Sequence, residues 1–381
     1  MIGYGHQYID DSDIAAVVEV LKSDFLTQGP AVAKFEQKIC EITGAKYCVA
    51  VSNATAGLHI AVAALELGND AEGITTPNTF LASSNCMVYN KMKPVFADIN
   101  PVSYNIDPKE IEKHISTKTR LLIPVHFAGL PCEMDKISMI AQKHNLHVIE
   151  DAVHAIGSQY SDGSYVGNCK FSDMTVFSFH PVKTITTGEG GAVTTNDKKL
   201  YKKLLMLRSH GTTKEDCLLT KNPGPWYYEM QSLGFNYRMT DMQAALGYSQ
   251  LKKLEFFKKR RREVIEMYNK AFSEMKYIKT PVEPDNVCSC FHLYVTQINF
   301  AALGKSRSQV MQELRDKGIG TQVHYIPVPT QPFYKETFGY KDGDYPVAEK
   351  YYEQALSLPL YPGLTDSDVS SVITAVKEVI G

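Results

Sequence analysis

The sequence predicts an α/β protein with a mostly parallel central sheet in a large domain and a smaller α+β domain at the C-terminus. From residue 47 onward, short β-branched runs alternate with amphipathic helical runs. This alternation is typical of parallel strands that are covered by helices on both faces. A length of 381 residues, with 44% hydrophobic and 22% charged residues, suits a globular chain of this organisation. We expect the large domain to span residues 1–245, and the connecting helix and small domain to span residues 246–381.

The expected elements of the large domain follow from this periodicity, taken in chain order. Helices are expected at 11–23, 32–42, 55–64, 108–114, 133–144 and 198–207. Strands are expected at 47–51, 94–97, 120–124, 146–150, 174–178 and 192–195. Segment 214–229, which holds two prolines and the only tryptophan, predicts a long surface loop.

The rest of the chain predicts a helical connection and a second, smaller unit. A helical run over 240–272 leaves the sheet, and its basic stretch 258–262 is interpreted as a solvated helix face. The small domain is expected to contain strands at 292–298 and 320–325, and helices at 306–317 and 366–380.

Composition and charge argue against several function classes. A net charge of −2 offers no basic surface for nucleic acid or an anionic membrane. No apolar run reaches membrane-spanning length, and the N-terminus lacks the pattern of a signal peptide. The eight cysteines show no CxxC spacing, which favours reduced thiols and no metal site. We therefore expect a cytoplasmic protein.

Lys183 stands between two expected strands and beside a glycine-rich turn, Gly188–Gly191. A lysine that is buried in such a place must lose its hydration. Two interpretations remain open at this point. Lys183 is either a partly exposed loop residue or a lysine that forms an imine with an aldehyde cofactor.

Polar residues also follow other expected strands, at the sheet edge where α/β proteins bind ligands. Ser52–Gly57 opens a helix with small residues, which suits either a phosphate cradle or an ordinary helix cap. Asp151 follows strand 146–150, with His154 three residues later, and Ser178 ends strand 174–178. Each of these signals is weak alone.

One cofactor accounts for all of these signals together. Pyridoxal 5'-phosphate (PLP) requires a lysine for its aldehyde, a carboxylate against its ring nitrogen and a phosphate cradle. An aromatic ring also commonly stacks on it. Lys183, Asp151, the Ser52–Thr55 turn with Ser178, and Phe80 supply one candidate for each role.

Longer motifs resemble a known family almost from end to end. They are LTQGPAVAKFE, SNATAGL, TTPNTF, VHFAG, EDAVHAIGS, FSFHPVKTITTGEGGAVTTND, LRSHG, LGFNYRMTDMQAALG, VHYIPV and LSLPLYPGLT. The chain resembles the DegT/DnrJ/EryC1/StrS family of PLP-dependent sugar-nucleotide aminotransferases. The resemblance implies an aspartate-aminotransferase-like fold (PLP fold type I), with a large PLP-binding domain.

The resemblance also implies roles for individual residues. Lys183 would carry PLP as a covalent aldimine and, once freed, move protons, with pyridoxamine phosphate formed in turnover. Asp151 would pair with the ring nitrogen, and His154 would approach the ring hydroxyl. The remaining cofactor contacts would be Ala54, Thr55 and Ser178 at the phosphate, Phe80 stacked on the ring, and Asn236 from the neighbouring subunit. The active site would then require a homodimer.

Within the family, IGYGHQYIDDSDI, DFLTQG and GIGTQVHYIP look most similar to the enzyme of pseudaminic acid biosynthesis. The implied reaction transfers an amino group from L-glutamate to C4 of a UDP-linked 4-keto-6-deoxy-N-acetylhexosamine. The implied sugar site consists of Tyr4, Phe25, Leu26, Thr27, Gln322, Val323, His324 and Tyr325. Family members often carry the motif HYxPLH, whereas this chain has HYIPVP. The second histidine of the family motif is therefore missing here, and no residue is assigned to the contact that it would make.

Three alternatives accompany this hypothesis. The substrate could be another keto-sugar nucleotide, linked to dTDP, GDP or UDP and aminated at C3 or C4. The chain could be a PLP-dependent sugar dehydratase, although those relatives have histidine in place of Lys183. It could also be a PLP-binding sensor without turnover, although no DNA-binding appendage is visible in the sequence.

Overall fold

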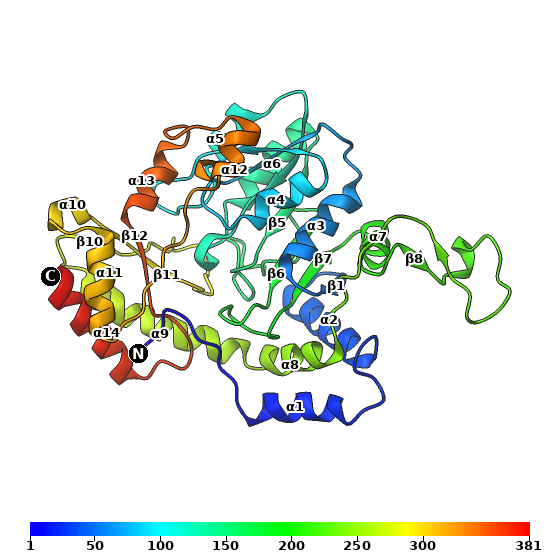
Figure 1. Cartoon of the computed structure of the whole chain (residues 1–381), viewed down its shortest axis with the longest axis horizontal. Coiled ribbons are helices and arrows are strands. Elements are labelled where there is room, and N and C mark those ends of the chain that lie inside the picture. Colours follow the sequence, from blue (N-terminus) through cyan, green and yellow to red (C-terminus); the bar gives the residue numbers. More distant parts are fainter.

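A seven-stranded sheet forms the centre of the computed structural model, which describes all 381 residues (Figure 1). Its strands are β1 Tyr47–Val51, β2 Glu72–Thr75, β3 Lys93–Phe96, β4 Thr119–Ile123, β5 His147–Asp151, β6 Met174–Ser178 and β7 Gly191–Thr195. Their order is β1-β7-β6-β5-β4-β2-β3. Only β7 runs antiparallel to its neighbours. The predicted α/β class is therefore confirmed.

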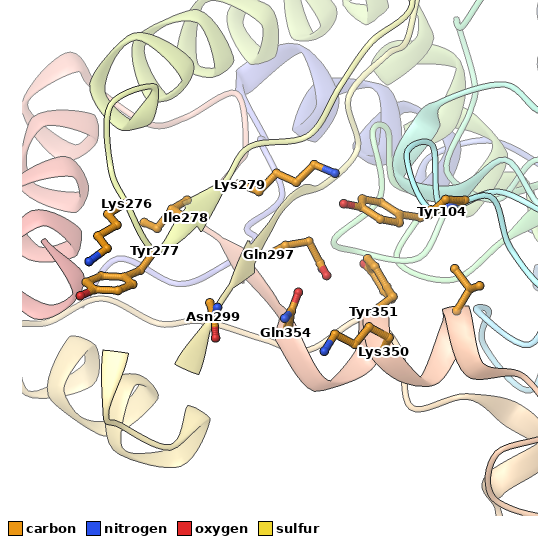
Figure 2. A pocket seen from close by; sticks show the side chains of 12 residues that line it. Tyr104, Lys276, Tyr277, Ile278, Lys279, Gln297, Asn299, Lys350, Tyr351 and Gln354 are labelled. Carbon is orange, nitrogen blue, oxygen red and sulfur yellow. The ribbon is translucent and has the colours of Figure 1, made fainter. Parts of the chain in front are cut away.

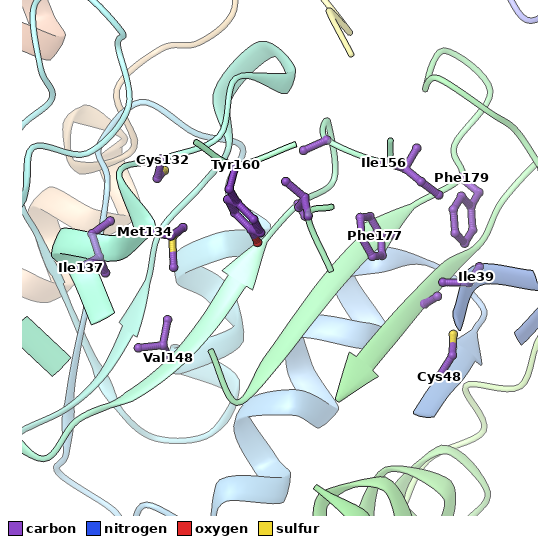
Figure 3. Close-up of a cluster of buried hydrophobic side chains, with 14 of the residues drawn as sticks. Ile39, Cys48, Cys132, Met134, Ile137, Val148, Ile156, Tyr160, Phe177 and Phe179 are labelled. Carbon is purple, nitrogen blue, oxygen red and sulfur yellow. The ribbon is translucent and has the colours of Figure 1, made fainter. Parts of the chain in front are cut away.

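Helices cover both faces of this sheet, as the alternation in the sequence predicts. They are α2 Pro30–Thr43, α3 Ala54–Leu65, α4 Ala82–Tyr89, α5 Pro108–His114, α6 Met134–His144 and α7 Lys198–Arg208, whereas α1 Asp11–Leu21 packs on α8 (Asp241–Leu251). Consecutive strand residues point to opposite faces. Phe177 of β6 accordingly joins one apolar cluster with Ile39 and Ile137 (Figure 3), whereas Val176 joins the cluster beneath α3. Both faces of the sheet are thus buried.

The C-terminal part has its own antiparallel sheet, in the order β10-β11-β12. Its strands are β10 Ile278–Lys279, β11 Tyr294–Ile298 and β12 Ala355–Leu358. Its helices are α10 Phe300–Leu303, α11 Arg307–Asp316, α12 Pro332–Phe338, α13 Pro346–Gln354 and α14 Asp366–Ile380. A cluster of 20 buried residues joins this sheet to α9, α11 and α14. The domain boundary at residue 245 stays a prediction; that position lies inside helix α8 (Asp241–Leu251).

A hairpin arm projects from the large sheet at the right of Figure 1. Its two short strands are β8 Thr212–Thr213 and β9 Glu229–Met230, which pair antiparallel. The predicted surface loop 214–229 forms the outer part of this arm and contains a short 3-10 helix, Asp216–Leu218. Two further 3-10 helices, Phe127–Gly129 and Val328–Thr330, lie in connections.

Two expectations about secondary structure are wrong, and two elements were not predicted. The helical run 240–272 is two helices, α8 and α9 (Leu254–Phe272), because the chain leaves helical geometry at Lys253. Segment 320–325 is not a strand. Only Gln322 pairs with the outer edge of β12, since the residues that follow turn towards the large cavity described below. Strand β2 and helix α4 were not predicted at all.

The basic stretch 258–262 is not a uniformly solvated face, because Arg261 is only 1% exposed. Its guanidinium donates hydrogen bonds to the carbonyl oxygens of Phe291, His292 and Leu360, at 3.0–3.3 Å. Arg261 therefore ties α9 to the connection that enters β11. Neither α9, with 19 residues, nor any other helix is long and apolar enough to cross a bilayer.

Candidate active site

A cavity of about 670 Å³ opens at the carboxyl ends of the parallel strands. The large sheet contributes Asp151 from the end of β5, and Ser178 and Lys183 from the end of β6 and the turn after it. The C-terminal part contributes His324 and Tyr325 from the connection that follows α11. Crevices at this edge of α/β sheets are where ligands bind, so the cavity is the candidate site.

Lys183 lies in the wall of this cavity and is half-buried. Burial lowers the pKa of its amine to about 8, although the nearby charge of Asp151 acts in the opposite direction. At pH 7 an amine with this pKa has a neutral fraction of roughly a tenth, far more than an exposed lysine has. Lys183 can therefore act both as a nucleophile and as an acid or base. Lys183 is thus partly exposed in a turn, and its lowered pKa favours the interpretation as an imine-forming lysine.

Asp151 is only 2% exposed and faces Lys183 across the cavity wall. Burial raises the pKa of its carboxyl group, while hydrogen bonds and the charge of Lys183 oppose that rise. Ser83 Oγ donates to Asp151 Oδ2 at 2.6 Å, and the N–H of Val153 donates to Oδ1 at 3.3 Å. Ser83 itself forms a 2.7 Å hydrogen bond with Thr79. This chain of hydroxyl groups orients the carboxylate towards the cavity.

A second buried carboxylate, Glu150, holds strand β5 from the opposite face. It accepts hydrogen bonds from His126 Nε2 at 2.7 Å, Tyr160 Oη at 2.5 Å and Ser172 Oγ at 2.5 Å. Burial alone would raise the pKa of Glu150, but these donors outweigh it and the pKa is lowered. Because Glu150 and Asp151 are consecutive in the strand, this network fixes the position from which Asp151 projects.

The start of helix α3 forms a pocket for an anion. Asn53 Oδ1 accepts a hydrogen bond from the N–H of Ala56 at 2.8 Å. The N–H groups of Ala54 and Thr55 belong to the first turn and have no partner within the helix. Both residues and Ser178 line the cavity. Free N–H groups, the helix dipole and a hydroxyl group together suit a phosphate.

Gly191 allows the strand after Lys183 to approach this helix closely. A Cβ atom at Gly191 would lie 2.7 Å from the backbone nitrogen of Ala54, which is closer than real Cβ contacts. The close approach brings β7 directly against the first turn of α3. This explains why glycine is required at the end of the glycine-rich turn.

Two neutral histidines form another wall of the cavity. His154 lies 4.5 Å from His292, measured between ring centroids, and burial lowers the pKa of both rings well below the usual value. His154 Nδ1 accepts a hydrogen bond from the N–H of Ala128 at 3.3 Å. The proton of the neutral ring is therefore on Nε2, which lies 3.2 Å from Tyr325 Oη. Tyr325 thus connects the C-terminal part to the wall that carries Asp151.

Most of the residues predicted from the sequence meet in this cavity. Those that line it are Tyr4, Ala54, Thr55, Phe80, Asp151, His154, Ser178, Lys183, His324 and Tyr325. Those that do not line it within one chain are Phe25, Leu26, Thr27, Asn236, Gln322 and Val323. The role given to each residue stays a prediction, including Phe80 as the stacking ring. Phe80 lies at the rim and is 57% exposed.

The sequence reasoning did not assign Ser83 or His292 to the site. A signal for Ser83 was present, because Ser83 comes three residues after the motif TTPNTF, which begins at the last residue of strand β2. That strand was not predicted, so its carboxyl end was not searched. His292 gave no local signal. It reaches the cavity only because the C-terminal part folds back onto the large sheet.

The side chains of the cavity fit pyridoxal phosphate. Lys183 provides an amine of lowered pKa, Asp151 an oriented carboxylate, and the start of α3 with Ser178 a phosphate pocket. These groups share one cavity that is large enough for a cofactor and a substrate together. The donor set is therefore that of a PLP site, as the sequence predicts.

Comparison with known proteins identifies the family. The DegT/DnrJ/EryC1/StrS aminotransferase family matches residues 7–377. The chain belongs to this family. It is 41% identical, over 378 residues, to the spore coat polysaccharide biosynthesis protein SpsC of Bacillus subtilis, covering 99% of this chain and 96% of SpsC. The resemblance described from the sequence motifs is confirmed.

Solved structures of this family share the whole fold. PseC of Helicobacter pylori, an aminotransferase involved in pseudaminic acid biosynthesis, superposes with a TM-score of 0.92 at 33% identity, covering 100% of this chain and 99% of PseC. The PLP form of Spr1654, a sugar aminotransferase from Streptococcus pneumoniae, superposes with a TM-score of 0.91 at 30% identity, covering 100% of both chains. The chain is a PLP-dependent aminotransferase, and the predicted enzyme class and cofactor are confirmed.

Proposed function

We propose that this aminotransferase moves an amino group from L-glutamate to C4 of a UDP-linked 4-keto-6-deoxy-N-acetylhexosamine, as a step towards pseudaminic acid. The observation that carries the proposal is the pair formed by Lys183 and Asp151 in a cavity that also has room for a sugar. The choice of sugar is supported by the match to PseC over the full length of both chains. It is also supported by Tyr4, His324 and Tyr325, which line the cavity where the sugar site was predicted.

Pyridoxal phosphate supplies an aldehyde that condenses with amines and a ring that accepts electrons. The residues of the chain provide the remaining functions. Asp151 would place a negative charge against the ring nitrogen, and Ser83 holds that carboxylate in place. Lys183 removes the proton from Cα of glutamate, and later delivers a proton to C4 of the sugar. Its pKa of about 8 makes it suitable for both transfers near neutral pH.

The direct test is to identify products by mass spectrometry after incubating the enzyme with L-glutamate and a panel of keto-sugar nucleotides. The panel should contain UDP-, dTDP- and GDP-linked sugars with the ketone at C3 or C4. We expect amination of the UDP-linked 4-keto sugar and release of 2-oxoglutarate. Lys183→Ala should abolish the product, whereas Lys118→Ala, at an exposed lysine before β4, should not. Preferential amination of a dTDP- or GDP-linked sugar would refute the proposed substrate.

We also propose that the active form is a homodimer with active sites shared between subunits. The hairpin arm exposes large apolar side chains, among them Trp226 at 70% and Leu233 at 76%. Such an apolar surface on a projecting arm suits burial against a second copy. Asn236 lies just beyond the arm and outside the cavity of its own chain, as expected of a residue that serves the neighbouring subunit.

Analytical ultracentrifugation tests the dimer directly. The double variant Trp226→Ser/Leu233→Ser should weaken the dimer at least tenfold and lower activity in proportion to the dimer lost. A matched control is Met139→Ser, which alters a 69% exposed apolar residue on α6. A fully active wild-type monomer would contradict the shared site.

A further inference from the structure

We propose that a second cavity, enclosed by β10, β11 and α13, is a binding site for a small anion that carries carboxylate or phosphate groups. This cavity has a volume of about 280 Å³ and shares no lining residue with the catalytic cavity. Its side chains come from the C-terminal part, and from Pro101 and Tyr104 of the large sheet domain; Figure 2 labels Tyr104 among them. The proposed transamination makes no use of it.

The charge of this cavity is one-sided. Lys276, Lys279 and Lys350 line it, and none of its twelve lining residues is acidic. The chain as a whole contains 40 basic and 42 acidic residues, so the imbalance is local. Figure 2 shows Lys279 of β10 and Lys350 of α13 on opposite sides of Gln297. Such an arrangement concentrates positive potential where an anion can be contacted from two directions.

Gln297 of β11 is a largely buried polar residue in the wall of this cavity. Its side chain is only 7% exposed, yet its amide nitrogen is buried without a hydrogen-bond partner. A buried donor without a partner is unfavourable, and native proteins keep few of them. Rotation about the last side-chain bond exchanges the two ends of the amide, so the N–H groups can face the cavity. A bound oxygen atom would then provide the missing acceptor.

The walls of the cavity are held rigidly. The rings of Tyr104 and Tyr351 lie 4.5 Å apart, and Tyr351 Oη donates to the carbonyl oxygen of His324 at 2.8 Å. Asn299 uses its side-chain oxygen to cap helix α10, by accepting from the N–H of Ala302 at 3.1 Å. Its amide N–H groups therefore remain for the cavity. The site thus combines lysine charges with amide donors, a set that recognises oxyanions.

The volume limits the size of the ligand. It equals roughly nine water molecules at about 30 Å³ each. This is enough for a phosphate ester or a small polycarboxylate. Carboxylate and phosphate oxygens are recognised by the same donors, so the two sources of the anion must be distinguished by experiment.

Isothermal titration calorimetry of the PLP-loaded enzyme, with pyrophosphate and with citrate in separate titrations, tests the proposal. We expect at least one anion to bind, and to bind at least tenfold more weakly to Lys279→Gln/Lys350→Gln. The matched control, Lys109→Gln/Lys118→Gln, removes two exposed lysines outside the cavity and should change the affinity less than twofold. Binding of pyrophosphate alone would assign a phosphate ester, and binding of citrate alone a polycarboxylate.

Gln297→Leu provides a second measurement. It should weaken anion binding severalfold, because the leucine side chain has no N–H group to donate to the anion. If neither pyrophosphate nor citrate produces a heat of binding, the proposal is overturned. Equal affinity in the lysine double variant and the wild type would also overturn it, since the anion would then be bound at another place.

Discussion

Removal of the Ser83 hydroxyl group should impair catalysis although Ser83 itself forms no part of the predicted chemistry. Its Oγ donates to Asp151 Oδ2 at 2.6 Å, inside a wall where Ser83 is 1% and Asp151 2% exposed. A hydrogen bond to a charged group contributes about 1.5–3 kcal/mol. If this stabilisation is lost from the ionised carboxylate that the reaction requires, the rate should fall roughly 10- to 150-fold.

The assay is the single-turnover reaction of the PLP-loaded enzyme with L-glutamate, followed by the loss of the cofactor's visible absorbance. Ser83→Thr keeps the hydroxyl group and should retain most of the rate. Ser84→Ala is the matched control, because the adjacent Ser84 is also buried but bonds to Tyr334 at 2.6 Å instead.

The pH profile gives a readout that a purely structural role would not change. Burial raises the pKa of Asp151 and the hydrogen bond from Ser83 lowers it. Removal of that bond therefore raises the pKa further, and the acid limb of the rate profile should move to higher pH. A rate within twofold of wild type, or an unshifted acid limb, would refute the reasoning.

Two further predictions concern the capture of the cofactor. In the cofactor-free protein Lys183 has a pKa of about 8. The neutral fraction of its amine, which is the nucleophilic form, should therefore rise about tenfold between pH 7 and pH 9. The rate of PLP capture, measured by stopped-flow absorbance, should rise by the same factor. An ordinary exposed lysine would show a rise of about a hundredfold over the same range, which would contradict the lowered pKa. Gly191→Ala should weaken PLP binding at least tenfold in equilibrium titrations, because the new methyl group would lie 2.7 Å from the backbone nitrogen of Ala54. The control variant Gly363→Ala should bind PLP normally, because the atoms nearest to the new methyl group are 3.7 Å away. Equal losses of PLP affinity in both variants would contradict a specific effect on the phosphate pocket.

The elements that were predicted well are those whose evidence is local. Strands β1 and β6 and helices α5 and α14 have the predicted bounds, since periodicity and caps are properties of neighbouring residues. Strand β2 was missed because Glu72–Thr75 is short and contains a glycine, a weak signal for a strand. Segment 320–325 has an acceptable strand pattern, but whether it pairs depends on an edge formed by β12, which lies 30 residues later.

The candidate site divides in a similar way. Lys183, Asp151 and Ser178 could be predicted because the carboxyl ends of parallel strands meet at one edge of a sheet. His292 and the burial of Arg261 could not, because each depends on contacts between distant segments.

The sequence alone determined the fold class, through strand–helix alternation, and the cofactor, through strand-end residues together with motifs that resemble a known family. Only the tertiary structure decided the pKa of Lys183, the hydroxyl group that holds Asp151 and the histidines that line the cavity. These properties arise from burial, and burial depends on how segments that are far apart in the chain pack together. For the same reason, the cavity around Gln297 could not be predicted from the sequence. Its lysines lie in β10, in α13 and between α9 and β10, and only packing brings them around one buried amide.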